Sequence, residues 1–168
     1  MALHEIKLDE LKIDPFVYFK TDWVLITAGD KEKANTMTAS WGGVGEIWGK
    51  AAATVYIRPQ RYTKEFVDKN EFFSISQFSP EFKEKLAYLG KVSGRDTDKI
   101  KDSDLTLEYI NGVPYFKEAR QVFIVRKLYA DEIKEEKFID KSLCTQFYPN
   151  KDYHTLYIGE IIKVLCDN

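Results

Sequence analysis

Two short stretches carry the side chains best able to do chemistry. Residues 56–63 have the sequence YIRPQRYT, which brings Arg58, Arg61 and the hydroxyl of Thr63 to the expected start of a helix. Guanidinium groups and the free backbone N–H groups of a helix N-terminus both donate hydrogen bonds to phosphate oxygens. The stretch therefore predicts a phosphate site. Its structural alternative is a tight corner between a strand and a helix, with two solvated arginines.

The second stretch is rich in glycine. Residues 35–50 have the sequence NTMTASWGGVGEIWGK, in which hydroxyls at Thr38 and Ser40 precede Trp41. We expect a strand over residues 35–41 that leads into a glycine-rich loop flanked by Trp41 and Trp48. Backbone N–H groups exposed in such a loop would bind the polar edge of a planar ligand.

Three common nucleotide-binding and catalytic motifs match this sequence only in part. The phosphate-binding P-loop motif fails because Val44 stands at its first glycine position and Ala51 at its Ser/Thr position. The dinucleotide fingerprint has Trp48 in place of its third glycine. A nucleophile elbow centred on Ser40 has Thr38 where its first glycine belongs. We interpret all three as chance matches.

Metal and thiol chemistry is not indicated either. The two histidines, His4 and His154, lie in no metal-binding motif, and His154 is interpreted first as a strand-end residue. Cys144 and Cys166 form no CxxC pair and are too few for a disulfide framework, so we expect free thiols.

Composition limits the class of protein. The chain has 168 residues and a formal net charge of −2, which suits one globular domain over residues 1–168 and lacks the general basic character of a nucleic-acid binder. No apolar run is long enough for a signal peptide or a membrane span, so a cytoplasmic protein is expected.

The expected elements are mostly strands. β-rich runs occupy residues 23–28, 35–41, 51–57, 71–78, 121–129 and 156–165, and Asn111-Gly112 predicts a hairpin between residues 105–110 and 113–116. Ser79 is expected to cap a helix that ends at Gly90, and Thr63 to cap a shorter helix over residues 63–69. Residues 130–141 are charged and are expected on the surface. With no regular βαβ alternation, this order favours a closed β-barrel with a few short helices.

Four segments taken together resemble the flavin reductase-like family, and especially its flavoredoxin-type branch. In chain order they are NTMTASW (residues 35–41), YIRPQRYT (56–63), SGRDTDK (93–99) and YHTLYIGE (153–160), and the resemblance covers residues 15–165. It implies a mainly β protein, the FMN-binding split β-barrel, with a few short helices.

The resemblance also implies a site. The isoalloxazine ring of FMN would lie against the strand end at residues 38–41, and the phosphate around Arg58, Arg61 and Thr63. The turn that begins at Ser93, with Asp96, would lie beside the flavin, and His154 and Tyr157 near it. The implied cofactor-binding residues are Asn35, Met37, Thr38, Ala39, Ser40, Trp41, Arg58, Arg61, Tyr62, Thr63, Ser93, Gly94, Arg95, Lys99 and His154. No catalytic side chain and no metal are expected, because the chemistry takes place on the flavin.

Three functions remain open under this resemblance. The first is an NAD(P)H-dependent flavin reductase, with hydride transfer from a transient NADH or NADPH to bound FMN. The second is a flavoredoxin-like electron carrier that works with protein redox partners, and the third is a flavin-binding module without turnover. The resemblance further implies a homodimer with flavin sites near its interface, where residues 130–141 and 147–149 would reach across to the partner's flavin. No membrane partner is expected.

Overall fold

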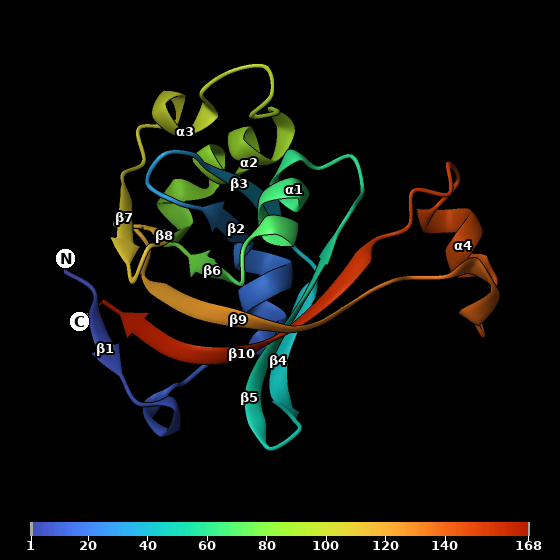
Figure 1. Cartoon of the computed structure of the whole chain (residues 1–168), viewed down its shortest axis with the longest axis horizontal. Coiled ribbons are helices and arrows are strands. Elements are labelled where there is room, and N and C mark those ends of the chain that lie inside the picture. The colour runs from blue at the N-terminus through green and yellow to red at the C-terminus, as the bar shows by residue number, and fades with distance from the viewer. Residues whose placement is uncertain (1, 168) are drawn as a thin grey trace.

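The structure, a computed structural model, describes residues 2–167 and is built mainly from antiparallel strands (Figure 1). The strands are β1 (His4–Ile6), β2 (Val24–Gly29), β3 (Ala34–Ala39), β4 (Gly42–Ile47), β5 (Lys50–Ile57), β6 (Phe72–Gln77), β7 (Leu107–Ile110), β8 (Val113–Phe116), β9 (Gln121–Glu132) and β10 (Thr155–Cys166). Strands make up 40% of the chain and helices 27%, which confirms the predicted mainly β class.

The large sheet forms a split barrel. Its strands follow the order β3-β2-β6-β9-β10-β5-β4, and β1 adds to β10 outside this path. Within residues 2–167 no ladder joins β3 to β4, so hydrogen bonding leaves the barrel open between these two strands. The expectation of a closed barrel is therefore wrong, and the split barrel implied by the resemblance is confirmed.

The core lies on both sides of β2. Val24 and Ile26 point into the barrel, where they pack with Phe73 and Phe123. On the other face Leu25 joins a second apolar cluster beneath a helix and the β7–β8 hairpin. Burial on both faces explains why three apolar residues, Val24, Leu25 and Ile26, follow one another in this strand instead of alternating with polar ones.

Eight short helices accompany the strands among residues 2–167. They are η1 (Leu8–Glu10), the π-helix η2 (Val17–Asp22), α1 (Tyr62–Lys69), η3 (Pro80–Phe82), α2 (Lys83–Lys91), α3 (Lys99–Asp102), η4 (Glu135–Lys137) and α4 (Ser142–Phe147). Figure 1 shows α1, α2 and α3 together above the sheet, whereas α4 and its flanking loops stand away from the body. We call residues 133–154, which connect β9 to β10, the arm.

The glycine-rich segment differs from its prediction. Residues 42–47 are not a loop: they form β4, which pairs with β5 from Gly42 opposite Val55 to Ile47 opposite Lys50. Trp48 and Gly49 make the two-residue turn, with φ values of 57° and 66°. Two successive positive φ values suit the right-handed twist of a hairpin, so this turn decides that the segment is a strand.

Two helix boundaries also differ. Gly90 lies inside α2 rather than after it. A Cβ there would lie 3.0 Å from the Cβ of Thr38, so the close approach of β3 favours glycine at this position. Arg61, not Thr63, occupies the N-cap position of α1. Of the segment expected on the surface, residues 130–132 continue β9.

Candidate functional site

A cavity of about 250 Å³ lies where β3, the start of α1 and the end of α2 meet. We call it the arginine cavity. Its lining residues are Asn35, Met37, Arg58, Gln60, Arg61, Tyr62, Thr63, Lys91, Val92, Ser93, Gly94 and Lys99. Of these lining side chains, four are cationic and none is acidic. A cleft lined by one sign of charge attracts a ligand of the opposite sign.

Arg61 is the cation with the most free donors. One guanidinium N–H binds the carbonyl of Gly90, with 2.6 Å between Nη1 and the oxygen, and within residues 2–167 the side chain has no ion pair. Burial and the neighbouring Arg58 charge lower its pKa from the usual arginine value. A bound anion would offset both effects, because a nearby opposite charge favours the charged form of the guanidinium.

Lys99 is the most buried of the four cations. Its ammonium group donates to the carbonyls of Leu89 (2.8 Å) and Val92 (2.9 Å) at the C-terminal end of α2. Burial, followed by repulsion from Arg61, lowers the pKa of Lys99 to about 8. The negative end of a helix favours a nearby cation, so Lys99 and Arg61 both stabilise the last turn of α2.

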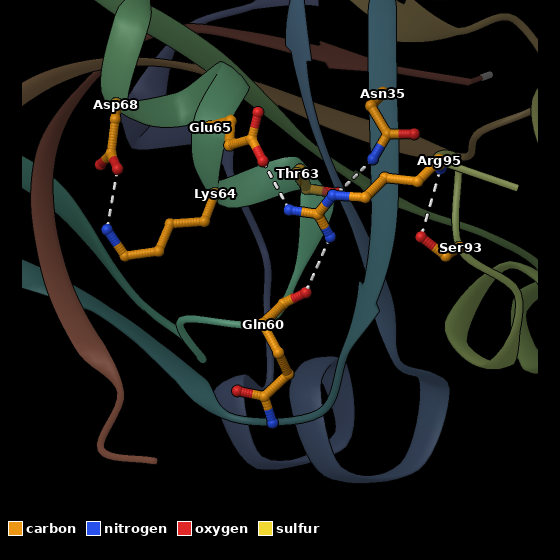
Figure 2. Close-up of polar contacts among 8 residues, drawn as sticks. All are labelled: Asn35, Gln60, Thr63, Lys64, Glu65, Asp68, Ser93 and Arg95. Atoms are coloured by element: carbon orange, nitrogen blue, oxygen red, sulfur yellow. Dashed lines mark hydrogen bonds and ion pairs between the residues drawn. The ribbon is translucent and has the colours of Figure 1, made fainter.

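The first turn of α1 opens toward the same cavity. Within residues 2–167, no backbone or side-chain acceptor takes the N–H groups of Tyr62 and Thr63. The Thr63 hydroxyl instead accepts a hydrogen bond from Asn35 Nδ2 at 2.8 Å, as Figure 2 shows. Gly94 packs against this pair, since a Cβ there would lie 2.1 Å from Asn35 Oδ1. These contacts hold β3, the first turn of α1 and the turn at Gly94 together, next to the two unpaired N–H groups.

Arg58 lines the cavity but is engaged elsewhere. Its Nη1 pairs with Asp152 Oδ2 at 2.7 Å, and its Nη2 donates to the carbonyl of Phe147 at 2.9 Å. The guanidinium also lies 5.1 Å from the centre of the Tyr148 ring. Arg58 therefore anchors the arm to the barrel, and Arg61 is left as the principal arginine donor.

A second cavity, of about 220 Å³, continues from the first and shares Met37, Arg58 and Arg61 with it. We call it the tryptophan cavity. Its lining residues are Met37, Thr38, Ala39, Ser40, Trp41, Tyr56, Arg58, Arg61 and His154. The Thr38 hydroxyl is used to bind the carbonyl of Leu86 at 2.5 Å, so it fixes α2 on β3 rather than facing a ligand.

His154 forms one wall of the tryptophan cavity. It is buried, its ring centre lies 5.1 Å from that of Trp41, and its Nδ1 is 2.8 Å from the Tyr148 hydroxyl. Burial, then the charge of Arg58, lowers the pKa of His154 to about 4, so the ring is neutral at pH 7. The structure therefore places His154 in the same cavity lining as Trp41 and Arg61.

Two residues expected at the site lie elsewhere. Tyr157 is fully buried, and its hydroxyl donates to Asp68 Oδ1 at 2.5 Å near the far end of α1. The Arg95 guanidinium turns to Glu65 Oε1 (2.5 Å) and the carbonyl of Gln60 (3.1 Å), as Figure 2 shows. These two bonds hold the Arg95 guanidinium beside α1, and the residue lines a separate, larger cavity instead of the arginine cavity.

That larger cavity measures about 540 Å³ and lies between the β2–β3 turn and α3. It touches the arginine cavity at Asn35, Tyr62, Gly94 and Lys99. Acidic side chains such as Asp96 and Asp98 line it together with lysines. Its mixed charge makes it a poorer phosphate site than the smaller arginine cavity.

Sequence reasoning missed several lining residues. Gln60 falls inside the quoted YIRPQRYT segment, and Lys91 and Val92 precede the Ser93 turn, so proximity to the motifs was an available signal. Asp152, which pairs with Arg58, gave no such signal, because the two residues lie 94 positions apart in the chain.

Among residues 2–167 no cluster of histidine, cysteine and acidic side chains is arranged to hold a metal ion. Within the same part of the chain, no helix has the length and apolar character needed to cross a membrane. Cys144 and Cys166 are free thiols, as expected.

The fold and the site define a split-barrel protein with a groove that is cationic at one end and aromatic at the other. Residues 16–168 match the model of the flavin reductase like domain, and the chain belongs to this family. A search of curated proteins finds no match.

Solved structures share this fold at low sequence identity. The FMN-binding domain of a flavin reductases-like enzyme from Shewanella baltica is 17% identical, with a TM-score of 0.71 over 98% of this chain and 77% of that one. A flavoredoxin of Desulfovibrio vulgaris is 22% identical, with a TM-score of 0.69 over 98% and 78%. The styrene monooxygenase flavin reductase from Pseudomonas putida is 16% identical, with a TM-score of 0.62 over 86% and 78%.

Proposed function

We propose that this protein binds FMN and acts as an NAD(P)H-dependent flavin reductase. The observation that carries the proposal is the acid-free arginine cavity, which opens directly into the tryptophan cavity. A phosphate at the first end and a flat ring at the second would match a flavin mononucleotide. Family membership and the FMN-binding and flavin reductase relatives support the same ligand.

The residues at the phosphate end fit this ligand. Arg61 keeps donors free, and the N–H groups of Tyr62 and Thr63, which have no acceptor within residues 2–167, form the positive end of α1. Lys99 adds another cationic side chain, whose pKa is lowered by burial and then by the charge of Arg61. A dianionic phosphate would complete the pairing, because charge-assisted hydrogen bonds are about twice as strong as neutral ones.

The residues at the ring end would orient the flavin. Ala39 and Ser40 line the cavity, and Trp41 and His154 form its aromatic side. When bound, FMN would accept electrons from a nicotinamide and pass them on, so the protein needs no nucleophile of its own. A neutral His154 adds a hydrogen-bonding group there without repelling the cationic oxidised nicotinamide.

One observation favours the alternative of a flavoredoxin-like electron carrier. Trp41 stands at the ring end with 41% of its surface exposed, so a protein partner would reach the edge of the site directly. The two functions differ in the electron donor. A flavoredoxin among the relatives keeps this second candidate open.

The test is anaerobic reduction of the purified, FMN-loaded protein, followed by absorbance near the flavin maximum. If the protein is a reductase, we expect NADH or NADPH to bleach the flavin rapidly and air to restore its colour. Slow bleaching by both nicotinamides, with fast bleaching by reduced ferredoxin, would replace it with the electron carrier. A protein that takes up no FMN would contradict both.

We further propose that the protein works as a homodimer that uses the arm. Ile139 is fully exposed on the arm, and Leu143 is also exposed, although both are apolar. Phe147 and Tyr148, in contrast, pack on Arg58, Trp41 and His154 of their own chain. The tip of the arm, rather than residues 147–149, is therefore the part available to a partner.

A further inference from the structure

A further cavity of about 370 Å³ adjoins the ring end of the groove. We call it the aromatic cavity, because Phe16, Phe19, Trp41, Tyr56 and Tyr148 line it. It shares Ser40, Trp41 and Tyr56 with the tryptophan cavity, so the two spaces are continuous. Walls of this kind receive flat aromatic molecules, since ring faces and edges attract one another in stacked and edge-to-face arrangements.

The N-terminal helical turn shapes one wall. Phe19 and Lys20 lie on the π-helix η2, a form that occurs mostly in single turns and often at functional sites. Phe19 is buried against Gly42, where a Cβ would lie 2.3 Å from the Phe19 ring. Glycine at position 42 of β4 therefore gives the Phe19 ring the room it needs. The packing of Phe19 on Gly42 holds this wall of the cavity in position.

Charge selects among aromatic ligands. Lys20 is the one charged side chain among the described residues that line the cavity, and within residues 2–167 no carboxylate pairs with its ammonium group. The hydroxyls of Ser40 and Tyr56 line the same space and bind no partner among those residues. One positive charge and two hydroxyls beside aromatic walls are complementary to a small aromatic ring that bears one negative group.

We propose that the aromatic cavity binds a small aromatic carboxylate, with the ring between the aromatic walls and the carboxylate at Lys20. This ligand would lie next to the flavin, a statement that rests on the proposed function, whereas its binding to the cavity does not. The volume suits a molecule of one or two rings. The proposal concerns a binding site and assigns no reaction to the ligand.

The test compares 4-hydroxybenzoate with 4-hydroxybenzamide, which has nearly the same shape but no charge, by isothermal titration of flavin-free protein. We expect the carboxylate to bind more tightly than the amide. Lys20→Ala should weaken the carboxylate about five- to tenfold and leave the amide nearly unchanged, since a charge-assisted contact at a partly exposed site is moderate in strength. Lys31→Ala, which removes a cation lining the larger cavity instead, should change neither.

A second variant tests the aromatic wall. Phe16 is 81% exposed, so Phe16→Ala removes a wall without disturbing the core, and it should weaken both ligands. Equal affinity for the two ligands, equal losses in Lys20→Ala and Lys31→Ala, or no binding of either ligand would overturn the proposal.

Repeating the titration with saturating FMN separates this proposal from the flavin site. We expect FMN and 4-hydroxybenzoate to bind together, because they would occupy neighbouring cavities. Mutual exclusion would mean that the carboxylate sits in the flavin groove and would overturn the proposal. Binding of 4-hydroxybenzoate by a protein that takes up no FMN would contradict the proposed function but support the aromatic cavity.

Discussion

The side-chain amide of Asn35 donates a hydrogen bond to the hydroxyl of Thr63, with 2.8 Å between nitrogen and oxygen. Both side chains are buried, and the bond joins β3 to the first turn of α1. The strand that leads toward Trp41 and the helix that begins after Arg61 are therefore fixed relative to each other. The Asn35–Thr63 hydrogen bond therefore helps to hold β3, which leads to the aromatic end of the groove, against α1, which begins at its cationic end.

Replacing Thr63 by Val should destabilise the fold and weaken FMN. The change keeps the shape of the side chain but leaves the buried Asn35 amide without its acceptor, which costs about 1–3 kcal/mol. Urea denaturation measures the loss. Thr106→Val, at an exposed threonine, is the matched control and should stay within about 0.5 kcal/mol of the parent protein. Equal stability of the two variants would contradict the role of the bond.

Arg61 and Arg58 should respond differently to removal. Arg61→Ala should weaken FMN about tenfold or more while barely changing riboflavin, because only FMN carries the phosphate. Arg58→Ala should change the affinities for FMN and riboflavin to the same extent. It should also make the arm more sensitive to protease, since Arg58 binds Asp152 and the Phe147 carbonyl.

Fluorescence titration with FMN and with riboflavin measures the affinities of both variants. Equal affinities of the parent protein for FMN and riboflavin would contradict the phosphate site itself.

FMN affinity should fall as the pH rises past the pKa of Lys99. That pKa, lowered to about 8, means that Lys99 is mostly charged at pH 7 and mostly neutral at pH 9. A phosphate favours the charged form, so FMN binding should take up a proton and weaken about threefold or more over this range. Riboflavin should show no such change.

The control for the pH effect is Lys99→Arg, whose guanidinium stays charged throughout. It should flatten the pH dependence of FMN binding even if its affinity is lower at pH 7. An unchanged pH profile in this variant would assign the titration to another group.

Removing the apolar tip of the arm should weaken the homodimer. Ile139→Asp places a charge where a fully exposed isoleucine now stands, so folding should be unaffected while self-association falls. Sedimentation velocity over a range of concentrations measures the effect. A parent protein that stays monomeric at all concentrations and keeps its full FMN affinity would rule out the dimer.

Much of this protein was determined by its local sequence. The β-rich runs and the Asn111-Gly112 hairpin appear as strands where short-range preferences place them. Four ordered segments were enough to indicate the family, and the family model confirms it. Arg61 and Thr63 were expected near one helix start because they lie two residues apart, and they line one cavity.

Tertiary structure alone decided how those residues are used. Arg58 and Arg61 look equivalent in the sequence, yet Arg58 is taken by Asp152, a carboxylate 94 residues further along the chain. Gly90 has the sequence context of a helix end, yet it lies inside α2, where the close approach of Thr38 on β3 favours glycine. Local preferences act over a few residues, whereas the partner of a charge or the neighbour of a glycine is set by strand order and packing between distant segments. The sequence therefore determined which groups could bind the ligand, and the fold decided which of them remain free to do so.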